Sequence, residues 1–246
     1  PHAPETFERC KIDPREADVP GAVLLGERQE RFLEEWAGDW SHGAWMKVVL
    51  SQSPFTNVAT LPADDKSGNA VPGLKVYARG EYPPDDRPVS DGDSNGWPQT
   101  PRNRAVRTLR SAFAVHITGD QHLGSLVQYG VEAWRDAGFA FCTPAIANTW
   151  PRRWMPAERG ATPWPGAPSY AGDYRDGFGN FMTVWAAANP YQTGVEPTAL
   201  HDRVPGYGIV RFDRLTRAVT FECWPRWVDP RARGTAQFDG WPKTVA

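Results

Sequence analysis

The spacing of apolar and polar positions along the chain predicts several helices and strands separated by long loops. Residues 25–37 place apolar side chains on one face and charges on the other, which predicts an amphipathic helix. A second helix is expected at 100–111, where a threonine followed by Pro101 is a typical helix start. The segment 124–137 is more weakly periodic, and we expect a helix there too.

Short runs of aliphatic, β-branched and aromatic residues predict strands. These runs are 45–51, 112–118, 139–147, 181–188, 206–213 and 218–224. The last two are joined by a short polar connection at 214–217, which favours a β-hairpin. Helices that alternate with strands and are followed by a hairpin predict an α/β fold with an α+β tendency.

Long loops are expected at 52–99 and 148–180, which are rich in proline and glycine. The 246 residues include 23 Gly, 24 Pro and 12 Trp, so the loops should be structured rather than disordered. Large tryptophan rings can anchor such loops, and they can also stack on sugars. Because the tryptophans are spread over the loops, we favour anchoring.

Charge and hydropathy exclude some classes of protein. The formal net charge is −2, so the chain has no nucleic-acid-binding signature, and no apolar run is long enough for a membrane span. The three cysteines, Cys10, Cys142 and Cys223, lie far apart in the sequence. This spacing excludes a dense disulfide framework and leaves open whether any two of them pair.

The strongest chemical signal is Gly-Asp-Gln-His at 119–122, directly after the predicted strand 112–118. It places Asp120 and His122 at the carboxyl end of a strand, where open α/β sheets bind ligands. Carboxylate oxygen and imidazole nitrogen suit Zn, Mn or Fe. The alternative is an ordinary strand-end turn, and we favour the metal site. His116 lies on the other strand face from its neighbours and is expected to be a hydrogen-bonded core histidine.

Several segments in a consistent order resemble the PhoD-like (alkaline phosphatase D) metallophosphatases of the calcineurin-like metallophosphoesterase superfamily. They are Leu-Gly-Glu-Arg-Gln at 25–29, Lys-Val-Val-Leu-Ser-Gln-Ser-Pro-Phe at 47–55, Asn-Gly-Trp-Pro at 95–98 with the arginine-rich helix behind it, Ile-Thr-Gly-Asp-Gln-His at 117–122 and Thr-Phe-Glu-Cys-Trp-Pro at 220–225. The resemblance covers roughly residues 20–228, and an ordered set of segments is more specific than any single motif.

The resemblance implies a two-sheet β-sandwich flanked by helices, with two metal ions at the strand ends and phosphate-ester hydrolysis by metal-activated water. Asp120 would be a catalytic metal ligand, and His122 a metal ligand or a phosphate-contacting acid. Many relatives have histidine where Asp120 stands, so Ca, Mg or Mn would compete with Zn or Fe. A periplasmic or secreted location is favoured by the resemblance alone.

Four residues are candidates for binding the phosphate-ester substrate. Gln52 stands where many relatives have a metal-binding histidine, and it offers an amide oxygen instead. Asn95 is placed to line the site, although Asn-Gly is also a common turn. Arg102 and Arg104 lie near a helix start and are able to clamp phosphate. Arginines on one helix more often form a solvated face, and that interpretation is favoured for this helix as well.

The first metal motifs of the family belong upstream of the helix at 25–37, and residues 1–24 contain none of them. Gly-Asp-x-x-Asp at 172–176 and Gly-Asp-x-x-His at 38–42 match only in spelling, and we interpret the first as a loop without a catalytic role. We therefore expect 1–24 to be an extended linker or a remnant of the upstream half, 25–228 the C-terminal half of the phosphatase domain, and 229–246 a tail.

The leading hypothesis is a PhoD-like phosphomonoesterase or phosphodiesterase represented by its C-terminal part. One rival is a catalytically inactive fragment or binding module of the same fold. A second rival is a tryptophan-rich carbohydrate-active protein, which would bind glycans without depending on a metal.

Overall fold

A computed structural model describes residues 13, 16, 18–65, 73–91, 96–147 and 149–246. The fold is mixed, with three β-sheets and few helices, which confirms the α+β tendency. The helices in these residues are α2 (Glu27–Gly38), α3 (Gln99–Ser111) and α4 (Thr198–His201). The strands are β1 (Val48–Leu50), β2 (Thr60–Leu61), β3 (Arg87–Pro88), β4 (Val115–Thr118), β5 (Ser125–Tyr129), β6 (Phe139–Cys142), β7 (Gly172–Arg175), β8 (Phe181–Ala187), β9 (Gly206–Phe212), β10 (Val219–Pro225) and β11 (Lys243–Val245).

The largest sheet has six strands in the order β1-β4-β6-β5-β8-β7. The pairs β1–β4 and β4–β6 are parallel, whereas β5 is antiparallel to both β6 and β8. Strands β1, β4, β6 and β8 therefore run in the same direction. Their carboxyl ends lie along one edge of the sheet, which is where open sheets of this kind bind ligands.

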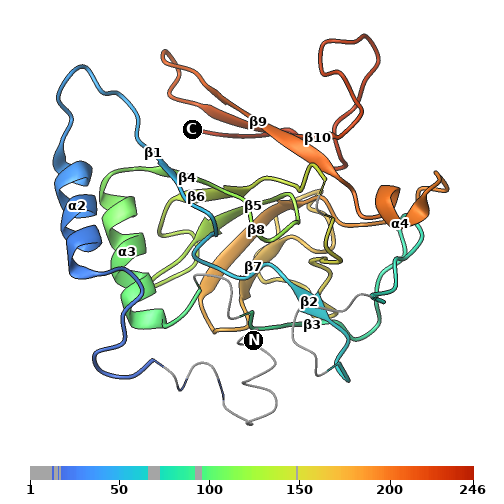
Figure 1. Ribbon diagram of the computed structural model, residues 1–246, viewed down its shortest axis with the longest axis horizontal. Helices are drawn as coiled ribbons and strands as arrows, with labels where there is room; N and C mark the ends of the chain where they lie inside the picture. Colours follow the sequence, from blue (N-terminus) through green and yellow to red (C-terminus); the bar gives the residue numbers. More distant parts are fainter. Residues whose placement is uncertain (1–12, 14–15, 17, 66–72, 92–95, 148) are drawn as a thin grey trace.

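The sheet packs on both faces, so the molecule has three layers (Figure 1). On one face, Val127 and Ala140 join a core that includes residues of α2 and α3. On the other face, Leu126 and Phe141 pack against the three-stranded sheet β11-β10-β9. Alternate residues of a strand point to opposite faces, so central strands buried on both sides are apolar throughout.

The predicted helices at 25–37 and 100–111 and the hairpin at 206–224 are confirmed, with boundaries shifted by a few residues. The helix expected at 124–137 is wrong, because its first part is strand β5. Both faces of β5 are buried, Val127 in the core on the helix side and Leu126 in the core beneath the small sheet. A strand buried in this way lacks the alternation that identifies strands.

Two further segments differ from the expectation. Residues 172–175, expected in a loop, form strand β7, which pairs with β8. The segment 229–246 carries little sequence pattern, yet β11 pairs with β10, and Phe238 and Trp241 are buried in the core beneath the small sheet. Pairing and burial of this kind depend on partners distant in the sequence. None of the helices in the described residues is long and apolar enough to cross a membrane.

Candidate functional site

Backbone hydrogen bonds continue beyond the carboxyl ends of β1, β4 and β6 and connect the segments that follow these strands. The Gly119 N–H donates to the Gln52 carbonyl (2.9 Å), and the Thr143 N–H donates to the Thr118 carbonyl (2.9 Å). These bonds bring the segment after β1 beside the Gly-Asp-Gln-His turn. Two of the predicted site residues, Gln52 and Asp120, are thereby adjacent although 68 residues separate them.

The Asp120 carboxylate accepts two hydrogen bonds from the segment that follows β1. Gln52 donates to one oxygen from its Nε2 (3.1 Å), and Ser53 donates to the other from its hydroxyl (2.6 Å). The Asp120 backbone is in the left-handed region, with φ of 70°. Aspartate tolerates this conformation better than most residues, but it is still uncommon and is typical of tight functional turns. The sequence did not indicate Ser53 as a partner.

His122 lies two residues further along the same turn, also in the left-handed region with φ of 56°. Its ring meets the ring of Trp150 edge-on, with centroids 6.5 Å apart. Between the two site residues, Gln121 is 1% exposed. Its side chain accepts from the Val58 N–H (2.8 Å) and donates to the Thr56 carbonyl (2.6 Å). Gln121 therefore anchors the turn and leaves Asp120 and His122 half-buried on either side.

The side chains at this turn include groups that can bind a metal ion. Asp120 and His122 supply oxygen and nitrogen ligands, and Gln52 has an amide oxygen in addition to the nitrogen that bonds Asp120. Across the described part of the chain, no group of three or more His, Cys, Asp or Glu side chains is close enough to hold an ion. The described residues at this turn therefore fit part of a metal centre.

A buried chain of hydrogen bonds runs behind this turn. His116 is 1% exposed, with its Nε2 2.7 Å from the Ser51 hydroxyl and its Nδ1 2.9 Å from the Tyr129 hydroxyl. Burial lowers the pKa of His116 to about 4, so the imidazole is neutral at pH 7. The expectation of a hydrogen-bonded core histidine is confirmed.

The row formed by Ser51, His116 and Tyr129 resembles a catalytic nucleophile with its general base. The assignment of hydrogen-bond donors and acceptors along the row favours a structural role instead. The Ser51 hydroxyl also lies 2.8 Å from the Ser53 carbonyl, an acceptor, and the Tyr129 oxygen already accepts from the Phe55 N–H (2.8 Å). Every group is satisfied if Tyr129 donates to Nδ1, Nε2–H donates to Ser51, and Ser51 donates to the carbonyl. His116 is then a donor to Ser51 and not its base.

This chain of hydrogen bonds supports the candidate site structurally. The chain from Tyr129 through His116 and Ser51 ends on the backbone of Ser53. The hydroxyl of Ser53 in turn donates to Asp120. Buried hydrogen bonds thus hold the residue that orients the candidate metal ligand, in the way that outer ligands commonly hold inner ones.

The remaining predicted substrate contacts are placed differently. Arg102 is fully buried and donates to the carbonyls of Phe55 (2.8 Å) and Gly130 (2.6 Å), a structural position without access to a ligand. Arg104 is exposed and pairs with Glu30 of α2 (3.1 Å), so α2 and α3 are linked there. Asn95 lies outside the described residues.

The Gly-Asp-x-x-Asp segment also has structural roles. The Asp173 carboxylate accepts from Arg135 (2.9 Å) and from the Thr183 hydroxyl (2.6 Å). Asp176 is buried and accepts from the Thr56 hydroxyl (2.9 Å) and the Asn57 N–H (3.0 Å). Both carboxylates hold loops against the sheet. Cys142 and Cys223 are free thiols in the core, and Cys10 lies outside the described residues.

Comparisons with protein-family models and with curated proteins find no match for this chain. The resemblance to PhoD-like metallophosphatases therefore rests on the ordered segments quoted above.

Proposed function

We propose that this chain contributes part of the active site of a metal-dependent phosphoric ester hydrolase similar to the PhoD-like enzymes. The observation that supports the proposal most directly is the Asp120 turn. An aspartate in the left-handed region, oriented by Gln52 and Ser53, stands at the carboxyl edge of parallel strands. A metal site in such a sheet requires a position at the ligand-binding edge. It also requires a carboxylate whose orientation is fixed by hydrogen bonds from neighbouring residues.

Asp120 and His122 are the ligands that the chain offers, and Gln52 and Ser53 position Asp120. We propose that the other ligands come from sequence upstream of residue 1, in agreement with the expected C-terminal half of a domain. Two bound metal ions would supply activated water and neutralise the phosphate oxygens. The large sheet carries helices on one face and the small sheet on the other, and the metallophosphoesterase core is itself part of the proposal.

The decisive measurement is hydrolysis of a chromogenic phosphate ester by the protein with its upstream coding sequence included, with and without a chelator. We expect turnover that the chelator abolishes and that added metal restores. Asp120→Asn should reduce that turnover by at least a hundredfold while leaving the circular dichroism spectrum unchanged. Ser53→Ala should reduce it about tenfold and raise the metal concentration needed for half-maximal activity, because it removes one orienting hydrogen bond.

Ser111→Ala is the matched control, since that hydroxyl bonds the Thr108 carbonyl on the exposed side of α3, away from the turn. Unchanged turnover in Asp120→Asn would refute the site assignment. An upstream sequence without further metal ligands would favour the inactive binding module. The 246 residues alone should show little or no activity, and robust turnover by them would contradict the proposal that half of the ligands lie elsewhere.

A further inference from the structure

A cavity of about 600 Å³ lies at the amino ends of β4 and β6, on the edge of the large sheet opposite to the candidate site. Its lining comes from the loop before β1, the segment that joins α3 to β4, residues 135–139, and the small sheet with its connecting turn. Most of the lining side chains are apolar, among them Met46, Phe113, Phe139, Val219 and Val245. This size and this composition are typical of a small-molecule site.

Phe113 is placed in this lining against two ordinary preferences. It directly follows the C-cap of α3, where its N–H donates to the Arg110 carbonyl (3.0 Å). The next N–H, that of Ala114, donates to the Leu109 carbonyl (3.1 Å), which completes a Schellman motif. Glycine is the usual residue at such a position, because φ is positive there, and for Phe113 it is 50°. The residue is also 84% exposed. Backbone strain at an exposed aromatic residue points to contact with a ligand.

Most charged side chains of the lining are already bonded. Arg110 pairs with Asp136 (3.4 Å), and Arg135 pairs with Asp173 (2.9 Å). The Asp136 carboxylate also accepts from three backbone N–H groups. Arg217 differs from these residues. Its guanidinium lies over the Trp45 ring and donates to the Trp45 carbonyl, and within the described part of the chain no carboxylate forms an ion pair with it.

These charges distinguish between classes of ligand. Among the described residues that line the cavity, Asp136 is the one acidic side chain, and its bonds leave little for a cation. A neutral apolar ligand would take water from Arg217 without giving the guanidinium a partner, which is unfavourable. An anionic group would accept from the remaining N–H donors of Arg217. The lining has three arginines and one aspartate, and counting the carboxylate of Ala246 as a second anion still leaves one positive charge in excess.

We propose that this cavity binds a free fatty carboxylate of medium chain length. The carboxylate would accept hydrogen bonds from Arg217, and the alkyl chain would pack against Phe113, Phe139 and Val219. The ring face of Trp45 is not required, because Arg217 already covers it. This inference does not depend on the proposed phosphatase activity, because the cavity lies at the opposite edge of the sheet and uses none of the residues of that site.

The test is calorimetric titration of the 246-residue chain with three probes that share a ten-carbon chain. They are decanoate, decan-1-ol and decyltrimethylammonium, each kept monomeric in solution. We expect decanoate to bind at least about tenfold more tightly than the other two, because hydrogen bonds between charged groups are the stronger class. Arg217→Gln should abolish this preference, and Arg217→Lys should keep most of it. Arg214→Gln is the matched control, because Arg214 is an exposed arginine of the same turn outside the lining.

Phe113→Gly separates binding from folding. Glycine suits the left-handed position, so the variant should unfold at a higher urea concentration than the wild type. It should nevertheless bind decanoate about tenfold more weakly, because the ring is lost. Leu215→Ala is the apolar control, since Leu215 is 95% exposed in the β9–β10 turn and does not line the cavity.

Three results would overturn the inference. One is decanoate binding no tighter than that of the neutral and cationic probes. Another is decanoate binding that Arg217→Gln and Phe113→Gly leave unchanged. The third is co-sedimentation of the protein with phosphatidylglycerol vesicles in the absence of decanoate binding, which would identify this end of the molecule as a membrane-facing surface instead.

Discussion

The Ser51 hydroxyl and the His116 imidazole lie 2.7 Å apart, although 65 residues separate them in the sequence. The bond joins the end of β1 to the middle of β4 and closes a buried chain that runs from Tyr129 to the backbone of Ser53. Because Ser53 orients Asp120, the packing of a core histidine and the geometry of the candidate site are connected.

This connection makes stability depend on pH in a defined window. An unfolded histidine has a pKa near 6.5, and burial lowers the pKa of His116 to about 4 in the folded protein. Between these values the unfolded chain binds the proton and the folded protein does not, so stability falls as the pH falls from about 6.5 to 4. The loss from this group is on the order of 3 kcal/mol in the free energy of unfolding.

His116→Gln isolates the contribution of that group. The variant should be less stable than the wild type at pH 8, because the bond to Tyr129 or to Ser51 is lost. The difference should narrow as the pH falls toward 4, since glutamine does not titrate. Urea unfolding at several pH values measures both effects. A difference that stays constant from pH 8 to pH 4 would show that His116 does not titrate in this way.

Arg102 and Arg104 lie on the same helix, and their substitutions should have very different effects on stability. Arg102→Met leaves the buried carbonyls of Phe55 and Gly130 without their donor, which should cost on the order of 3 kcal/mol. For a chain of this length that corresponds to a fall in Tm of about 10 °C. Arg104→Met removes an exposed ion pair and should cost less than about 1 kcal/mol. Thermal unfolding of both variants measures the contrast, and equal effects would refute the structural role of Arg102.

Gly177 is required by a close approach of two backbones. A Cβ at this position would lie 2.0 Å from the Val89 carbonyl, so Gly177→Ala has to move one of two loops. We expect a loss of about 3 kcal/mol or more in the free energy of unfolding. Gly38→Ala is the control, because a Cβ there meets nothing within 4 Å at the end of α2, and it should be neutral or slightly stabilising. Chemical denaturation compares the two, and a neutral Gly177→Ala would contradict the close approach.

Segments with a regular spacing of apolar residues could be predicted from the sequence, because that spacing reflects one buried face. Helix α2 has an apolar face and a charged face, and the β9–β10 hairpin has two strand runs around a polar turn. Strand β5 was missed because its two faces are buried in the two cores on either side of the sheet, so apolar and polar residues do not alternate along it. Strand β11 was missed because its pairing partner, and not its own pattern, makes it a strand.

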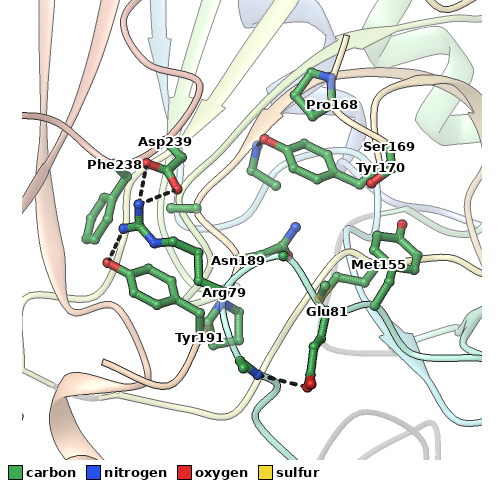
Figure 2. A pocket seen from close by; sticks show the side chains of 16 residues that line it. Arg79, Glu81, Met155, Pro168, Ser169, Tyr170, Asn189, Tyr191, Phe238 and Asp239 are labelled. Atoms are coloured by element: carbon green, nitrogen blue, oxygen red, sulfur yellow. Dashed lines mark hydrogen bonds and ion pairs between the residues drawn. The ribbon is translucent and has the colours of Figure 1, made fainter. Parts of the chain in front are cut away.

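The candidate site also combines features that the sequence predicted with features that only the tertiary structure revealed. The sequence by itself determined the Gly-Asp-Gln-His turn after a strand and the expectation that His116 would be a core residue, because both follow from local strand geometry. Only the tertiary structure decided that Ser53 bonds Asp120, that Gln121 anchors the turn and that Arg102 is buried. It alone assembled the cavity beside the end of β8, which is lined by Met155 and by residues of four separate segments (Figure 2). Contacts of this kind join residues that are far apart in the chain, and their geometry exists only when the sheet and its loops pack together.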